Sequence, residues 1–194
     1  MMEGVRYAWR DPVIRGMLLV LAAINLAAIG PLVVGGAALA EQRLGGTAAF
    51  GIFLSAFGGG SLIGVILAGS VRRAGHRGLT VLGVATVFGL GLVALGFVPG
   101  LSLALAVAAT MGVGSGYLGV VLVAWLQERV EAGVRGRVMS LVVFAVVALD
   151  PISYALAGAT MELGLTVTFA SAGAFMLLIV VLFGVTRRKV LEFD

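Results

Sequence analysis

The segment RGRVMSLVVFAVVALDPISYALAGAT, residues 135–160, begins with two arginines and then carries no further charge until Asp150. As a helix, its apolar part reaches across the hydrocarbon core of a bilayer, about 30 Å at ~1.5 Å per residue. Arginines suit the membrane surface, whereas a carboxyl group at mid-span costs at least ~2.5 kcal/mol in lipid. The segment therefore predicts a membrane-spanning helix whose Asp150 faces protein or a water-filled cavity.

The composition of the whole chain is that of a membrane protein. Of its 194 residues, 61% are hydrophobic and only 11% are charged, whereas soluble proteins average about 45–50% and ~25%. Six apolar blocks are separated by short polar connections, so we predict an all-α integral membrane protein with one domain over residues 1–194 and six transmembrane helices. The predicted spans are at about residues 15–40, 47–71, 79–98, 101–126, 138–160 and 165–186.

Lysine and arginine lie almost entirely on one side of the predicted membrane. All 13 except Arg43 fall in the N-terminal segment, in the connections after the second and fourth spans, or near the C-terminus. By the positive-inside rule, both termini are cytoplasmic. The net charge of +4 is explained by this topology, so we expect no nucleic-acid partner.

The sequence offers little to an enzyme or a metal site. The chain has no cysteine, and its single histidine, His76, falls in a predicted cytoplasmic loop, away from Ser115 in the fourth span. A serine nucleophile needs a base at its own depth, and an aspartyl protease needs a second carboxylate beside Asp150. Zinc needs three or four ligands. We therefore predict no enzymatic activity, no cofactor and no metal.

Small residues follow one face of the predicted second span. Gly60, Gly64 and Ala68 recur at every fourth position, which permits a close approach between helix backbones. Residues 114–119 match the G-x-G-x-x-G spacing of dinucleotide-binding turns, but they lie within a span and no strand precedes them. We predict helix packing at both places.

Polar side chains at middle depth share faces of the predicted helices, because residues three and four apart lie on the same side of a helix. The candidate residues of a substrate or ion pathway are Asn25, Thr110, Tyr117, Asp150, Ser153 and Tyr154. The stripes on the fourth and fifth spans can line a cavity. For Asn25 and Thr110 taken singly, the alternative is a hydrogen bond between helices, worth about 0.6 kcal/mol.

Asp150 has two competing interpretations. Desolvation favours the neutral carboxyl group, and no lysine or arginine is predicted at its depth, so the residue would be a proton-sensitive gate element. Asp before Pro151 is also a helix-start signature, in which the carboxylate caps the N–H groups exposed where proline removes the bond to the carbonyl of Val147. The sequence leaves both open.

Two stretches resemble transporters of the major facilitator superfamily, in its drug and siderophore exporter branch. Residues 127–140, QERVEAGVRGRVMS, resemble the loop between helices ten and eleven, and residues 3–12, EGVRYAWRDP, are similar to the lead into helix seven. The loop after the second span, with Arg72, Arg73 and Arg77, resembles in part the family's G-x-x-x-D-R-x-G-R-R gating motif, with Arg72 in the place of its aspartate.

The resemblance implies the C-terminal half of such a transporter, with two three-helix repeats, in a bacterial inner membrane. Expected partners are the lipid bilayer, a small-molecule substrate, and a second six-helix half or a second copy. Its function would be the ion-coupled export of small amphipathic molecules, an antiport by alternating access. The alternative is a non-transporting six-helix scaffold or subunit. Residues assigned to cytoplasmic gate loops are Arg72, Arg73, Arg77, Arg135 and Arg137.

Overall fold

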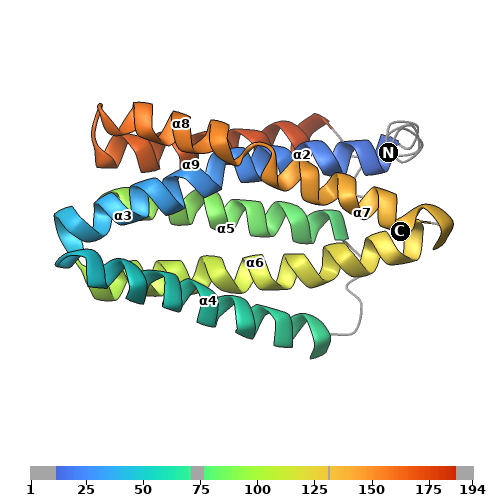
Figure 1. The fold of residues 1–194 in the computed structure, drawn as a ribbon, viewed down its shortest axis with the longest axis horizontal. Helices are drawn as coiled ribbons and strands as arrows, with labels where there is room; N and C mark the ends of the chain where they lie inside the picture. Colours follow the sequence, from blue (N-terminus) through green and yellow to red (C-terminus); the bar gives the residue numbers. More distant parts are fainter. Residues whose placement is uncertain (1–11, 71–76, 131, 187–194) are drawn as a thin grey trace.

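A computed structural model describes residues 12–70, 77–130 and 132–186 of the chain. All regular structure within these residues is helical, and the helices run along one long axis of a bundle (Figure 1). Five stretches are long and apolar enough to cross a membrane, which identifies an all-α, multi-pass membrane protein. These stretches are Leu21–Leu44, Thr47–Ser70, Gly78–Phe97, Leu101–Arg129 and Leu165–Gly184.

The chain first passes along the bundle as one run of helix that changes type. This run, the first crossing, consists of α2 (Pro12–Gly30), the π-helical η1 (Pro31–Gly35), α3 (Gly36–Leu39) and the π-helical η2 (Ala40–Leu44). The wide turn of η1 begins at Pro31, which has no N–H to donate to the carbonyl four residues earlier. The first crossing is therefore irregular from its middle onward.

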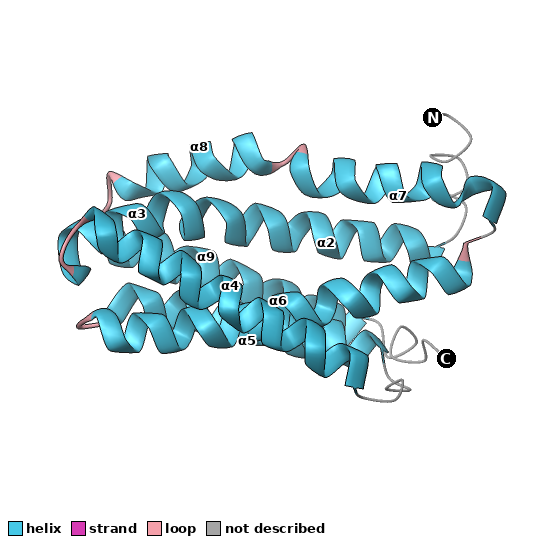
Figure 2. Ribbon diagram, turned by 60° about the horizontal axis from the view of Figure 1, so that its bottom comes forward, coloured by secondary structure: helices cyan, strands magenta, loops and turns pink. Residues whose placement is uncertain are grey.

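Four of the remaining helices are unbroken: α4 (Thr47–Ser70), α5 (Arg77–Phe97), α6 (Leu101–Arg129) and α9 (Leu165–Thr186). The predicted helix over residues 138–160 is interrupted instead. It consists of α7 (Ala132–Val147) and α8 (Asp150–Met161), which lie end to end along the bundle (Figure 2). Neither piece has the ~20 residues that cross a bilayer.

Successive crossings of the bundle run in opposite directions. The turns at residues 45–46, 98–100 and 162–164 lie together at one end, while α2 begins and α9 ends at the other (Figure 1). Glycines with positive φ, a conformation that glycine adopts readily, form the first and last of these turns. Within the bundle, α4 packs chiefly on α6, α5 on α9, and α2 on α8.

The predicted small-residue face of the second span is confirmed. Gly60 and Gly64 of α4 lie directly against the backbone of α6, where a Cβ atom would overlap the carbonyls of Ala109 and Val113. Gly116, from the G-x-G-x-x-G match, packs in the same way against the carbonyl of Ser61. The glycines replace side-chain contact between α4 and α6 by contact between backbones.

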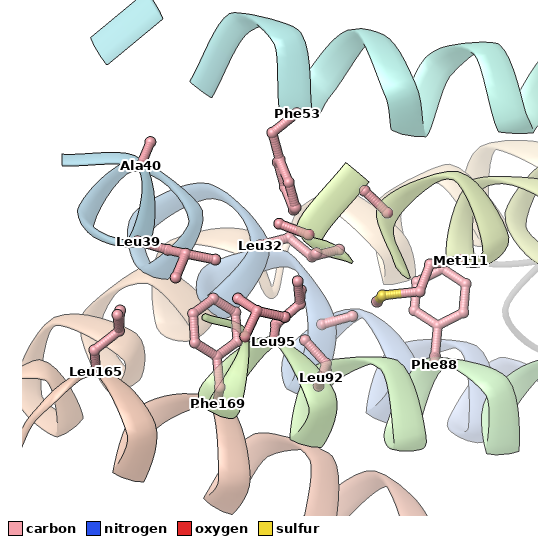
Figure 3. Close-up of a cluster of buried hydrophobic side chains, with 14 of the residues drawn as sticks. Leu32, Leu39, Ala40, Phe53, Phe88, Leu92, Leu95, Met111, Leu165 and Phe169 are labelled. Carbon is pink, nitrogen blue, oxygen red and sulfur yellow. The ribbon is translucent and has the colours of Figure 1, made fainter. Parts of the chain in front are cut away.

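Two separate clusters of buried apolar side chains hold the helices together. The main core lies where the first crossing meets α4, α5, α6 and α9, and it includes Leu39, Phe53, Leu92, Met111 and Phe169 (Figure 3). A second cluster joins α2, α6 and α7. Its buried members are Leu21, Trp125, Leu126, Val130, Val138 and Val142. Consequently α7 packs on the second cluster, whereas α8 packs on α2, η1 and α9.

Candidate functional site

The break between α7 and α8 is set by Pro151. Because proline has no backbone N–H, the carbonyl four residues earlier loses its regular donor. The N–H of Ala148 still completes the last turn of α7, and the N–H of Ser153 donates to the carbonyl of Leu149 at 2.9 Å, which starts α8. The chain therefore resumes its helix with Asp150 as the first residue.

One carboxyl oxygen of Asp150 is buried without a hydrogen-bond partner. Its Oδ1 atom is shielded from solvent, and no group in the described part of the chain donates to it. Oδ1 therefore does not act as a cap, and both interpretations of Asp150 stay predictions. Burying a carboxyl oxygen without a hydrogen bond is costly, so this atom does not stabilise the fold.

Charged groups are scarce around α8. The helix packs against α2, η1 and α9, and in the described part of these three elements the single charged residue is Arg15. Arg15 precedes Leu26 by about eleven residues, which is roughly 16 Å along a helix. On α7, the nearest cation along the chain is Arg137, in the helix's first half. Asp150 therefore has no cation from these elements at its own level.

Ser153 joins α8 to the first crossing. Its hydroxyl donates to the carbonyl of Leu26 at 2.7 Å and accepts the N–H of Gly30 at 2.8 Å. In a regular α-helix those two backbone groups are partners of each other, so the hydroxyl stands at one rung of the α2 ladder. A Cβ atom at Gly30 would overlap the carbonyl of Ser153. We call this contact of Ser153, Leu26 and Gly30 the Ser153 joint.

The other predicted pathway residues are spread over two helices and α8. Asn25 is half-buried on α2, directly before Leu26 of the joint, and Tyr154 is exposed on α8. Thr110 and Tyr117 lie on α6, whose main packing partners are α4 and α5. The hydroxyl of Thr110 donates back to the carbonyl of its own turn, from Ala106, at 2.8 Å. The structure therefore gathers Asp150 and Ser153 with α2, and leaves Thr110 apart from them.

Arg135, assigned to a cytoplasmic gate loop, folds back onto the end of α6. Its Nη2 donates to the carbonyls of Gln127 at 2.6 Å and Val130 at 3.3 Å. The last carbonyls of a helix lack helical donors and carry partial negative charge, so a guanidinium group stabilises them. Arg135 thus fastens the start of α7 to the end of α6.

Two of the remaining arginines of the predicted gate loops, Arg77 and Arg137, lie among the described residues. Arg72 and Arg73 lie outside the described residues. Arg77 is the first residue of α5. Arg137 is exposed on α7, two residues after Arg135.

Arg43 has a structural role that sequence reasoning missed. Its Nη1 donates to the carbonyl of Gly96 at 2.8 Å and its Nη2 to the hydroxyl of Thr166 at 2.9 Å, while that hydroxyl donates to the same Gly96 carbonyl at 2.9 Å. This Arg43 clamp ties the end of the first crossing to the last turn of α5 and the first turn of α9. The available signal was that Arg43 stands alone on its side of the predicted membrane.

Asp150 is thus the single acidic residue of α8 and of the three elements on which α8 packs, and the hydroxyl of Ser153 joins its helix to α2. Among the described residues, no three His, Cys, Asp or Glu side chains gather to hold a metal ion. Comparison of the chain with models of protein families, with curated proteins and with solved structures gave no match. Its function is therefore inferred from the site's own residues.

Proposed function

We propose that this chain is one half of a secondary active transporter that exports small amphipathic molecules by alternating access, coupled to an ion gradient. The observation that carries the proposal is the buried Oδ1 of Asp150, which lacks a partner among the described residues. An ionisable group within the membrane costs free energy, and at this atom no hydrogen bond offsets that cost by stabilising the fold. Dye transport by vesicles that hold the chain, with and without a pH gradient, tests the proposal.

The proton is the coupling ion that this site suits best. A single carboxyl oxygen can take up and release a proton, whereas hard metal cations need several oxygen ligands. Breaks in membrane helices are also places where transporters bind coupling ions. The polar side of α8 near Asp150 and Tyr154 would then belong to the pathway between this half and its partner.

The proposal takes α7 and α8 together as a sixth crossing, so that both termini are cytoplasmic. It is supported by the turns that alternate along the bundle, and by the resemblance of residues 127–140 to the exporters of the major facilitator superfamily. In that family each half contains two three-helix repeats. A bacterial inner membrane would be the place of such a transporter.

Cysteine labelling tests this topology, and the chain has no cysteine of its own to interfere. Leu163 in the turn after α8 is 72% exposed, and Gly133 near the start of α7 is also exposed. In intact cells, Leu163→Cys is expected to react with a reagent that does not cross membranes, and Gly133→Cys is expected to react only after lysis. The reverse pattern would contradict the orientation, and labelling of both from outside would contradict a sixth crossing.

A second six-helix half, or a second copy of the chain, is the proposed partner. Thr110 of α6 and Tyr154 of α8 expose polar side chains that would otherwise meet lipid. In a mild detergent or a lipid disc, the purified chain is expected to self-associate or to bind an N-terminal half. Light scattering measures the mass of the protein part. A strict monomer that neither pairs nor moves any solute would support the scaffold instead.

The scaffold remains the second candidate because several hydroxyl groups of the described residues are already bonded within their own helices. Ser55, Thr86 and Thr110 each donate to the carbonyl four residues earlier, at 2.8 Å. Such bonds serve only the helix that makes them. A six-helix subunit without transport activity needs no more than these bonds and the close contacts of glycines with the backbone of the facing helix.

A further inference from the structure

We infer that Ser153 is a positioning residue that couples the protonation of Asp150 to the bend of the first crossing, an inference that rests on the proposed proton-linked role of Asp150. Ser153 lies three residues after Asp150, on the same side of α8. Its side chain is 1% exposed, and its hydroxyl both donates and accepts a hydrogen bond across the helix interface. A movement of the first turn of α8 therefore moves α2 with it.

The Ser153 joint sits where the first crossing is easiest to bend. Gly30 is the last residue of α2, and Pro31 begins the π-helical η1. Proline removes one backbone bond there, and π-helical turns weaken the regular ladder. The hydroxyl of Ser153 bonds to both the carbonyl of Leu26 and the N–H of Gly30. It therefore acts on the last α-helical hydrogen-bond position before Pro31.

The far part of the first crossing is held in place, so movement is confined to its near part. Arg43 ties η2 to α5 and α9, and Leu39 and Ala40 are completely buried in the main core. The near part, α2, joins the main core through Ile24, Ala27 and Ala28, close to the joint, and its earlier residues meet α6 and α7 through the small second cluster around Leu21. In this proposal the first residues of α2, up to Leu21, swing about the joint while the outer end stays fixed.

The driving force is the change of charge on Asp150. When the carboxyl group loses its proton, the buried Oδ1 needs a donor or water, and α8 must shift to provide one. Among the described residues of the elements that adjoin α8, no opposing cation stands at that level. α2 contributes Arg15 near its start, η1 and α9 contribute no charged residue, and α7 contributes Arg135 and Arg137 in its first half. Protonation restores the arrangement that the structure describes.

Spin-label distances test the coupling in the full chain, held in lipid discs. Leu19 of α2 is 52% exposed and Val123 of α6 is 39% exposed, so Leu19→Cys and Val123→Cys accept labels without disturbing the core. In the parent, the distance between the labels is expected to differ between acidic and alkaline pH by on the order of 2 Å or more. Asp150→Asn is expected to abolish this change. Ser153→Ala is expected to abolish it as well, although Asp150 is still present.

Thr168→Val is the matched control for the loss of a buried hydroxyl. Thr168 is also 1% exposed, but its hydroxyl donates to the carbonyl of Gly164, one turn earlier at the start of α9, at 3.1 Å. This variant is expected to keep the full response to pH. If Ser153→Ala does not fold, Ser153→Thr retains a hydroxyl and is expected to retain the response; loss of the response in folded Ser153→Thr would overturn the inference.

The outcomes separate the joint from the proposed function. A response of Ser153→Ala equal to that of the parent would overturn the joint and leave the role of Asp150 intact. A parent without any response, or an unchanged response in Asp150→Asn, would overturn the proton-linked role of Asp150 and the joint with it.

Discussion

Gly60→Ala is expected to destabilise the protein, whereas Gly59→Ala, one residue earlier on the same helix, is expected to leave it equally stable or slightly more stable. At Gly60 the added Cβ atom would overlap the backbone of Ala109 on α6, while at Gly59 it would meet nothing within 4 Å. Overpacking a close contact costs about 1–3 kcal/mol. Alanine in place of glycine returns up to ~1 kcal/mol of helix propensity, which alone acts at Gly59.

The free energy of unfolding, measured by titrating the protein with a denaturing detergent and following its circular dichroism, tests this difference. Gly112→Ala is expected to repeat the effect from the other helix, because its Cβ atom would overlap the carbonyl of Phe57 on α4. Gly58→Ala provides a second control with open space around it. Equal stabilities of Gly60→Ala and Gly59→Ala would show that α4 and α6 do not touch through their backbones.

This contact could be predicted because its signal is local. Gly60 and Gly64 lie one turn apart, and only packing explains so many small residues in an apolar helix. The lengths of the unbroken helices were predictable for the same reason: the apolar runs begin at Thr47, Leu101 and Leu165, where α4, α6 and α9 begin. Hydrophobic length and the charges that flank it are properties of a short stretch of sequence.

The break before Asp150 was only partly predictable. Pro151 predicted the loss of one backbone hydrogen bond, but the length of the apolar run predicted one continuous helix. Which effect prevails depends on what the two pieces pack against. α7 rests on the second cluster, with Val138 and Val142, while α8 is fastened to α2 through Ser153. These contacts come from distant parts of the chain.

The Ser153 joint and the Arg43 clamp could not be predicted from the sequence. Ser153 meets Leu26 and Gly30 across more than a hundred residues, and Arg43 meets Thr166 across a similar separation. A serine in an apolar span is equally compatible with a bond to its own helix, as Thr110 makes. Only the packing of α8 on α2 decides between the two.

Asp150→Asn is expected to remove the dependence of transport on the proton gradient. Asparagine has nearly the shape of aspartate, so it preserves the packing at the start of α8, but it cannot exchange a proton at neutral pH. Coupling between two binding events is commonly worth 1–3 kcal/mol, or about 5–150-fold. We therefore expect stimulation by a pH gradient to fall about tenfold or more. The measurement is efflux of ethidium, a fluorescent amphipathic cation, from vesicles that hold the chain and its partner half.

Glu162→Gln is the matched control, because it removes a carboxylate of the same chain that is exposed just after α8. Transport by this variant is expected to keep the parent's dependence on pH, since Glu162 lies in the exposed turn after α8 and not at the break between α7 and α8. If Asp150→Asn also kept that dependence, the carboxyl group would serve only the helix start, and the coupling would have to be sought elsewhere. If it lost the dependence but kept a slow, gradient-independent efflux, then Asp150 would be the group that links the proton to the cargo, since the pathway itself would have survived the substitution.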